Sequence, residues 1–128
     1  MRETTVQFST DREEELVGLL KKTGMKLSGA KILVFLLKAG EAPMRRIERE
    51  TDLRQGEVCY GMKELDTRGW IRRRTKQLAP RGRPDTIVAL STPAGKIIDS
   101  IEEMILKQGE DRLRQIRSAK RSIKGITE

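Results

Sequence analysis

The sequence predicts a mainly α-helical protein with a small β-hairpin, and three observations support this prediction. Between residues 28 and 68, apolar residues recur at helical spacing, in segments separated by glycines and a polar turn. Residues 70–74 and 87–90 have the composition of strands, and the loop between them is rich in arginine, glycine and proline. The order helix, turn, helix, strand, basic loop, strand is typical of a winged helix-turn-helix, here with extra N- and C-terminal helices.

The first two predicted helices precede this arrangement. Ser9 or Thr10, followed by five charged residues of which four are acids, is a helix-start signature, because carboxylates are favourable near the positive end of the helix dipole. Gly24 stops this helix. The second helix runs from about 28 to 40, and its segment 32–37 is apolar on nearly every side. We therefore expect it to be the central core helix.

The next two helices form the predicted helix-turn-helix. Pro43 suits the first turn of a helix, where its missing N–H costs nothing. A turn at 51–53 leads into a longer helix over 55–68. Three apolar residues in it recur at i, i+4 and i+7 and predict one buried side: Val58, Met62 and Leu65.

The opposite side of this helix is the candidate surface for reading DNA bases, because recognition helices read bases mainly with their first turns. The candidates are Arg54, Gln55, Gly56, Cys59, Tyr60 and Lys63. Gln55 can pair with adenine, Arg54 with guanine or a phosphate, and Lys63 with a phosphate. Gly56 would let the backbone come close to DNA, whereas Cys59 is more often structural than reactive. The simpler interpretation is an amphipathic helix with a solvated polar side, but the basic hairpin that follows favours DNA.

That hairpin is the sharper signal. Between Arg68 and Arg83 the chain has seven basic residues and no acid. The candidates for DNA contact in and beside the predicted wing, 77–86, are Arg72, Arg74, Lys76, Arg81, Gly82 and Arg83. Residues 81–84, Arg-Gly-Arg-Pro, match the core of the AT-hook peptide, whose arginines lie in narrow minor grooves. The alternative is a solvated turn that uses Gly82 and Pro84 only for geometry.

The C-terminal segment, 93–128, is predicted to be helical and to have two different halves. Residues 93–106 are acidic and rich in isoleucine, whereas 112–124 carry six bases and no acid. Gly109 is expected to weaken the helix, and the spacing across it is not a strict heptad, so we do not expect a long coiled coil. The apolar side can pack on its own domain or pair with a second subunit, and we favour a dimer through four residues: Ile97, Ile101, Met104 and Ile105.

Composition limits the classes of function. The 128 residues include 27 Lys and Arg against 19 acids, a net charge of +8, which is typical of proteins that bind phosphate backbones or anionic membranes. The chain has no histidine and one cysteine, Cys59, so the usual general bases, triads and zinc sites are missing. The longest apolar run, 32–37, is too short to span a bilayer, and no apolar signal region begins the chain. We expect a cytoplasmic protein without enzymatic activity, metal, cofactor or membrane partner.

From about Leu27 to Ser100 the chain resembles archaeal and bacterial winged helix-turn-helix regulators of the MarR-like and TrmB-like groups. Five pieces carry the resemblance through their order and spacing: 44–51, 53–58, 63–65 with 69–71, 82–84, and 90–96. Arg54 departs from the pattern, because many relatives have Ser or Thr there to cap the recognition helix. Glu57 can supply only half of the capping box.

These observations predict a homodimeric, sequence-specific regulator of transcription that binds double-stranded DNA. Its expected parts are an N-terminal segment and helix (1–24), a DNA-binding domain (25–92) and a C-terminal dimerisation segment with a basic tail (93–128). Residues 54–68 would enter the major groove and 77–86 would contact the minor groove or the backbone. Two alternatives stay open: an architectural, chromatin-type protein with little sequence preference, and a winged-helix module that binds another protein.

Overall fold

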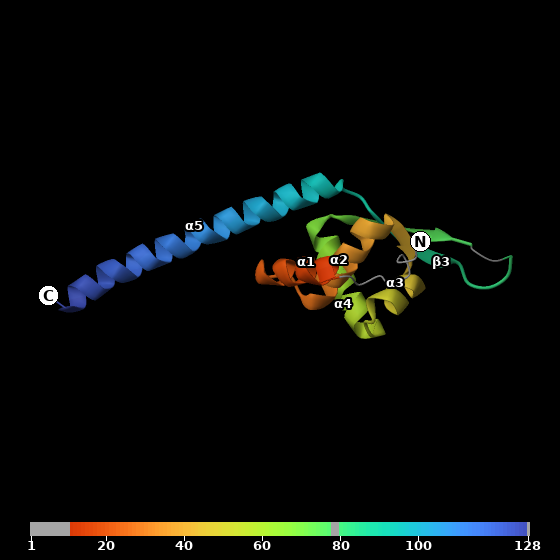
Figure 1. The fold of residues 1–128 in the computed structure, drawn as a ribbon, viewed down its shortest axis with the longest axis horizontal. Coiled ribbons are helices and arrows are strands. Elements are labelled where there is room, and N and C mark those ends of the chain that lie inside the picture. Colours follow the sequence, from red (N-terminus) through yellow and green to blue (C-terminus); the bar gives the residue numbers. More distant parts are fainter. Residues whose placement is uncertain (1–10, 78–79, 128) are drawn as a thin grey trace. The chain divides into compact units, whose positions relative to one another are not determined.

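The computed structural model describes residues 11–77 and 80–127 and confirms the predicted fold class (Figure 1). Within those residues, five helices accompany a three-stranded antiparallel sheet. The elements are α1 (Asp11–Lys22), α2 (Leu27–Ala39), β1 (Glu41–Pro43), α3 (Met44–Thr51), α4 (Gln55–Arg68), β2 (Ile71–Lys76), β3 (Asp85–Leu90) and α5 (Ala94–Thr127). The predicted helix start at Ser9 or Thr10, and Leu78 and Ala79 of the predicted wing, lie outside the described residues.

The chain forms two compact units, Met1–Ala94 and Gly95–Glu128. The core of the first unit is built around α2, as the sequence predicted. Ile32, Leu33 and Leu36 are completely buried, and α2 packs against α1, α3 and α4. From α4, the three residues of the predicted apolar side are also buried: Val58, Met62 and Leu65.

Helices α2 and α4 cross where both have a glycine. A Cβ atom built on Gly61 of α4 would lie 2.8 Å from the backbone nitrogen of Gly29 and 2.8 Å from the carbonyl carbon of Ser28, both in α2. Real Cβ contacts are essentially never that short, so only a glycine permits this approach. The crossing therefore fixes how deeply α4 sits on the core, and with it how far the outer side of α4 projects.

One turn further along α4, Glu64 joins the two helices by a polar contact. Its Oε1 accepts a hydrogen bond from the backbone N–H of Lys26, the N-cap residue of α2, at 3.1 Å. The carboxylate thereby sits beside the positive end of the α2 dipole. Arg68 pairs with Glu64 at 3.4 Å, and its guanidinium also lies 5.1 Å from the centre of the Trp70 ring. These contacts hold the inner edge of α4 in place.

The sheet has the order β1-β3-β2, so the predicted hairpin gains a third strand that the sequence analysis did not predict. Ala42 of β1 pairs with Val88 of β3, and Arg73 of β2 pairs with Val88 from the other side. The expectation that Pro43 lies in the first turn of a helix was wrong by one position. Pro43 ends β1 and is the N-cap residue of α3, with an extended backbone at φ −66° and ψ 149°.

The second unit contains α5, a single helix of 34 residues. The weakening expected at Gly109 does not interrupt it, since a glycine inside a helix costs only about 1 kcal/mol relative to alanine. The helix instead continues through the acidic half and the basic half without a break. Among the helices described, none combines the length and hydrophobicity needed to cross a membrane.

Candidate nucleic-acid interface

The turn between α3 and α4 determines where the outer side of α4 begins. Asp52 adopts the left-handed conformation, φ 56° and ψ 36°, and ends α3, while Leu53 is buried and anchors the turn. At the start of α4, the Glu57 carboxylate accepts a hydrogen bond from the backbone N–H of Arg54 at 2.9 Å. Arginine has no acceptor, so it cannot return a bond to the helix. The half capping box expected from the sequence is therefore present, and the Arg54 side chain remains available at the helix start.

The six residues proposed to read bases all lie on the exposed side of α4 or directly before it. Arg54 is the N-cap residue of α4, and Gln55 and Gly56 are its first two residues. Cys59 and Lys63 are exposed, and Tyr60 has 59 % of its surface open, which is high for an aromatic residue. The structure thus brings together an amide, a phenol and a guanidinium at the N-terminal end of one helix. Those groups can donate and accept hydrogen bonds at base edges and phosphates.

The basic hairpin belongs to the same first unit as α4. In Figure 1 its strands β2 and β3 extend beyond the helices around them. Gly82 has φ 111°, a backbone conformation that residues with a side chain rarely adopt. Its carbonyl oxygen accepts a hydrogen bond from Gln77 Nε2 at 3.0 Å. Four basic residues are exposed and form no ion pair with a described residue: Arg72, Lys76, Arg81 and Arg83. They are the part of the hairpin with charge available for an anionic partner.

Two other arginines of β2 are engaged by acids from the same unit. Arg74 makes a two-pronged ion pair with Glu41 of β1, with both Nη–Oε distances at 3.0 Å. This hydrogen bonding lowers the pKa of the Glu41 carboxyl from its ordinary value and raises the pKa of Arg74. Arg73 pairs with Asp66 of α4. The DNA contact predicted for Arg74 stays a prediction, and it would compete with Glu41.

Replacing Glu41 with glutamine is expected to strengthen binding to any DNA duplex, because Arg74 would lose its internal partner. The slope of log affinity against log salt concentration should become steeper by about one, as expected for one added phosphate contact. Because its pKa is lowered, the wild-type carboxylate stays charged until the pH falls through that lowered value, so the difference should persist across neutral pH. Fluorescence anisotropy at several salt concentrations measures it. Unchanged affinity and slope would mean that Arg74 does not meet DNA.

The four residues predicted for dimerisation lie in the first part of α5 but differ in exposure. Ile97 and Ile101 are buried, Met104 is half-buried, and Ile105 is 47 % exposed. Their role in a dimer stays a prediction. Five more large apolar residues are exposed farther along the helix: Leu106, Leu113, Ile116, Ile123 and Ile126.

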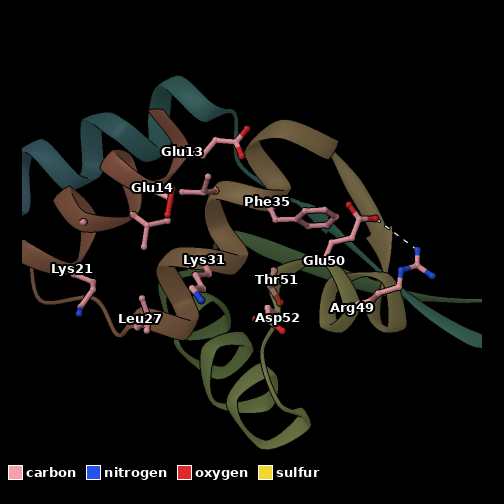
Figure 2. A pocket seen from close by; sticks show the side chains of 13 residues that line it. Glu13, Glu14, Lys21, Leu27, Lys31, Phe35, Arg49, Glu50, Thr51 and Asp52 are labelled. Atoms are coloured by element: carbon pink, nitrogen blue, oxygen red, sulfur yellow. Dashed lines mark ion pairs between the residues drawn. The ribbon is translucent and has the colours of Figure 1, made fainter. Parts of the chain in front are cut away.

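A groove of about 550 Å³ lies in the first unit between α1, α2 and the end of α3 (Figure 2). Figure 2 shows Glu13 and Glu14 from α1, Phe35 from α2 and Glu50 from α3 around it, with the Arg49–Glu50 ion pair at 3.8 Å on its rim. Its described lining includes no residue that the sequence singled out for DNA contact. The part of the chain that the structure describes also has no cluster of three or more metal-binding side chains.

Three structural roles escaped the sequence analysis. Gly61 and Glu64 position α4, and Glu41 neutralises an arginine of the hairpin. An unexplained glycine inside a helical pattern was the one available signal for Gly61. The partners of Glu41 and Glu64 lie 33 and 38 residues away along the chain, so no local pattern indicates them.

Comparison with solved structures finds similar architectures. A possible transcriptional regulator from Methanosarcina mazei Go1 superposes with a TM-score of 0.59 at 11 % identity, over 75 % of this chain and 80 % of that one. Overoxidised AbfR bound to DNA has a TM-score of 0.50 at 23 % identity, covering 75 % and 74 %. The disulfide form of AbfR has a TM-score of 0.52 at 22 % identity, covering 91 % and 81 %.

The chain has the winged-helix fold. Neither protein-family models nor the sequences of curated proteins give a match.

Proposed function

We propose that this protein is a sequence-specific, double-stranded-DNA-binding regulator of transcription that acts as a homodimer in the cytoplasm and catalyses no reaction. Its α4 would enter the major groove, and the hairpin tip at 81–83 would contact the minor groove or the backbone. The observation that carries the proposal is the exposed first half of α4, with Gln55 and Tyr60, in one compact unit with a hairpin whose segment 71–84 has basic residues and no acid. The MarR-like or TrmB-like grouping suggested by the sequence belongs to the same proposal.

Two kinds of contact would contribute affinity and specificity separately. Arginines and lysines neutralise phosphates, which supplies affinity that falls steeply with salt. Base-edge contacts from Gln55, Tyr60 and their neighbours supply the difference between one sequence and another. The neighbours in structure comparisons are in keeping with this, since one is described as a possible transcriptional regulator and AbfR has been solved with DNA.

The test begins with selection of tightly bound duplexes from a random pool, followed by alanine variants. Gln55→Ala and Tyr60→Ala should lose affinity for the selected duplex by about 1–3 kcal/mol each while retaining most binding to random DNA. Lys63→Ala, the matched control on the same side of α4, should weaken both duplexes alike, because a phosphate contact has no sequence preference. Equal losses on both duplexes for Gln55→Ala and Tyr60→Ala would contradict base reading by α4.

An architectural, chromatin-type protein is the second candidate, favoured by the basic hairpin, whose exposed arginines need no base contact to bind DNA. The ratio of affinities separates the two functions. A regulator should prefer its selected duplex to random DNA by about 10³-fold or more, whereas an architectural protein should select little. The remaining alternative from the sequence is a protein-interaction module. For such a module, replacing Arg81 and Arg83 would not change the affinity for either duplex.

A further inference from the structure

The second half of α5 carries a cluster of basic side chains on one side. Residues 112–127 include six bases and no acid. Four of the bases recur at i, i+3, i+4 and i+7, which places them on one side of a helix, and they are here termed the α5 basic patch: Arg117, Lys120, Arg121 and Lys124. All four are exposed, and none of them forms an ion pair with another residue that the structure describes.

Like charges at these spacings repel one another, so the patch weakens α5 rather than stabilising it. Three arginines elsewhere in the described helices have a carboxylate three or four residues away: Arg46 with Glu50, Arg68 with Glu64, and Arg114 with Asp111. The patch has no such acid within residues 112–127. Its charge is therefore left for dissolved ions or for an anionic partner.

The patch has nearly the charge density of one strand of duplex DNA. From 117 to 124 the helix rises about 10.5 Å at 1.5 Å per residue. One DNA strand presents a phosphate about every 3.4 Å along the duplex axis, so the same length contains about three phosphates. Four cationic side chains can neutralise such a run, and the two arginines can also bind phosphate oxygens in a bidentate manner.

We propose that the α5 basic patch binds the phosphate backbone of double-stranded DNA and reads no sequence. This proposal rests on the proposed function for its partner, duplex DNA, but it assigns the contact to the second unit, whereas α4 and the hairpin belong to the first. Contacts to phosphates carry no sequence information. The patch therefore adds affinity for DNA of any sequence, and the ratio between selected and random duplexes does not depend on it.

The apolar residues of the same half of α5 distinguish DNA from an anionic membrane as the partner. Ile116, Ile123 and Ile126 are exposed and, at about 100° per residue, their centre lies about 125° around the axis from the centre of the patch. A helix that binds a membrane surface buries its apolar side at the level of the lipid headgroups. The patch would then point away from the lipid phosphates, whereas a DNA duplex can contact the patch directly and leave the apolar side uncovered.

The first test compares two double variants of the full chain by fluorescence anisotropy. Arg117→Gln with Arg121→Gln removes two charges from the patch, and Lys96→Gln with Lys107→Gln, the matched control, removes two from the first half of the same helix. With a slope of about 0.9 per phosphate contact up to about 1 M salt, two contacts contribute roughly thirtyfold in affinity at about 0.15 M. The patch variant should therefore lose roughly thirtyfold for selected and random duplexes alike, with a salt slope smaller by about two. The control should lose less than about threefold, because salt screens its long-range attraction.

Two further measurements separate the loss of charge from other effects. Arg117→Lys with Arg121→Lys keeps both charges and should retain the wild-type salt slope. Glutamine has nearly the helix propensity of arginine, so circular dichroism should give the same helix content for every variant. The slopes are compared at protein concentrations where light scattering gives all chains the same mass, so that a change of subunit state cannot imitate a lost contact.

The outcomes separate the patch from the proposed function. Wild-type affinity and slope in the patch variant would overturn the patch as a DNA contact and leave base reading by α4 intact. A loss in the patch variant of a protein that selects no sequence would support the patch and contradict sequence-specific regulation. A wild-type chain that binds no duplex would overturn both. Binding to phosphatidylglycerol vesicles that depends on the patch, with DNA affinity unchanged, would assign the patch to membranes instead.

Discussion

Alanine at Gly61 is expected to destabilise the first unit by about 3 kcal/mol, the upper part of the usual range for an overpacked core. The added methyl group would lie 2.8 Å from two backbone atoms of α2 and 2.9 Å from Ile32 Cδ1. A side chain could move aside, but backbone atoms can yield only if α2 and α4 separate, which would open the core. Urea unfolding followed by fluorescence measures the change, because the chain has one tryptophan, Trp70, and it is buried.

Gly56→Ala is the matched control, since it makes the same substitution in the same helix. Nothing lies within 4 Å of a Cβ built there, and the residue is helical. This variant should gain about 0.5–1 kcal/mol of stability from the better helix propensity of alanine. If Gly61→Ala unfolds at the same urea concentration as Gly56→Ala, the two helices do not approach as closely as described.

The double variant Arg81→Ala with Arg83→Ala should lose about 1–3 kcal/mol of DNA-binding free energy, roughly 5- to 150-fold in affinity, at moderate salt. Both side chains are exposed and form no ion pair among the residues described, so their loss should leave the fold intact. The slope of log affinity against log salt should fall by about two, one for each phosphate-directed charge. Anisotropy titrations with A·T-rich duplexes at several salt concentrations measure both quantities.

Lys21→Ala with Lys22→Ala removes the same charge from the last turn of α1, where both residues are exposed, and serves as the control. Its loss of affinity should be small, because only long-range attraction is reduced and salt screens it within about 10 Å. Equal losses in the two double variants would indicate that net charge, rather than the hairpin tip, determines affinity.

The sequence predicted those elements whose residues repeat at a fixed period. Val58, Met62 and Leu65 indicated the buried side of α4, and the apolar segment 32–37 indicated the central helix. Strand β1 escaped because its three residues are too few to show alternation and include a proline, which is depleted in strands. It forms because β3 offers a free edge to Ala42.

The sequence was sufficient to predict which residues of the candidate site are exposed, but not which of its arginines form ion pairs. All six residues proposed to read bases are exposed. This agrees with the prediction, which placed them away from the buried side of the helix. The pairing of Arg74 with Glu41 depends on β1 and β2 flanking β3, a property of the folded sheet rather than of either segment. The helix predicted for the C-terminal segment runs without interruption through Gly109, where the sequence predicted only a weakening, because the rest of a long helix compensates for one glycine.

The anchoring of α4 has a consequence for the divergence of related genes. The contacts that hold this helix, through Gly61 and Glu64, involve none of the side chains proposed to read bases. Substitutions at positions 55, 59 or 60 therefore change the proposed DNA contacts of α4 without disturbing the contacts that hold this helix on the core. Duplicated copies of such a gene could acquire new target sites by a few substitutions, each nearly neutral for folding, while the supporting positions remain fixed.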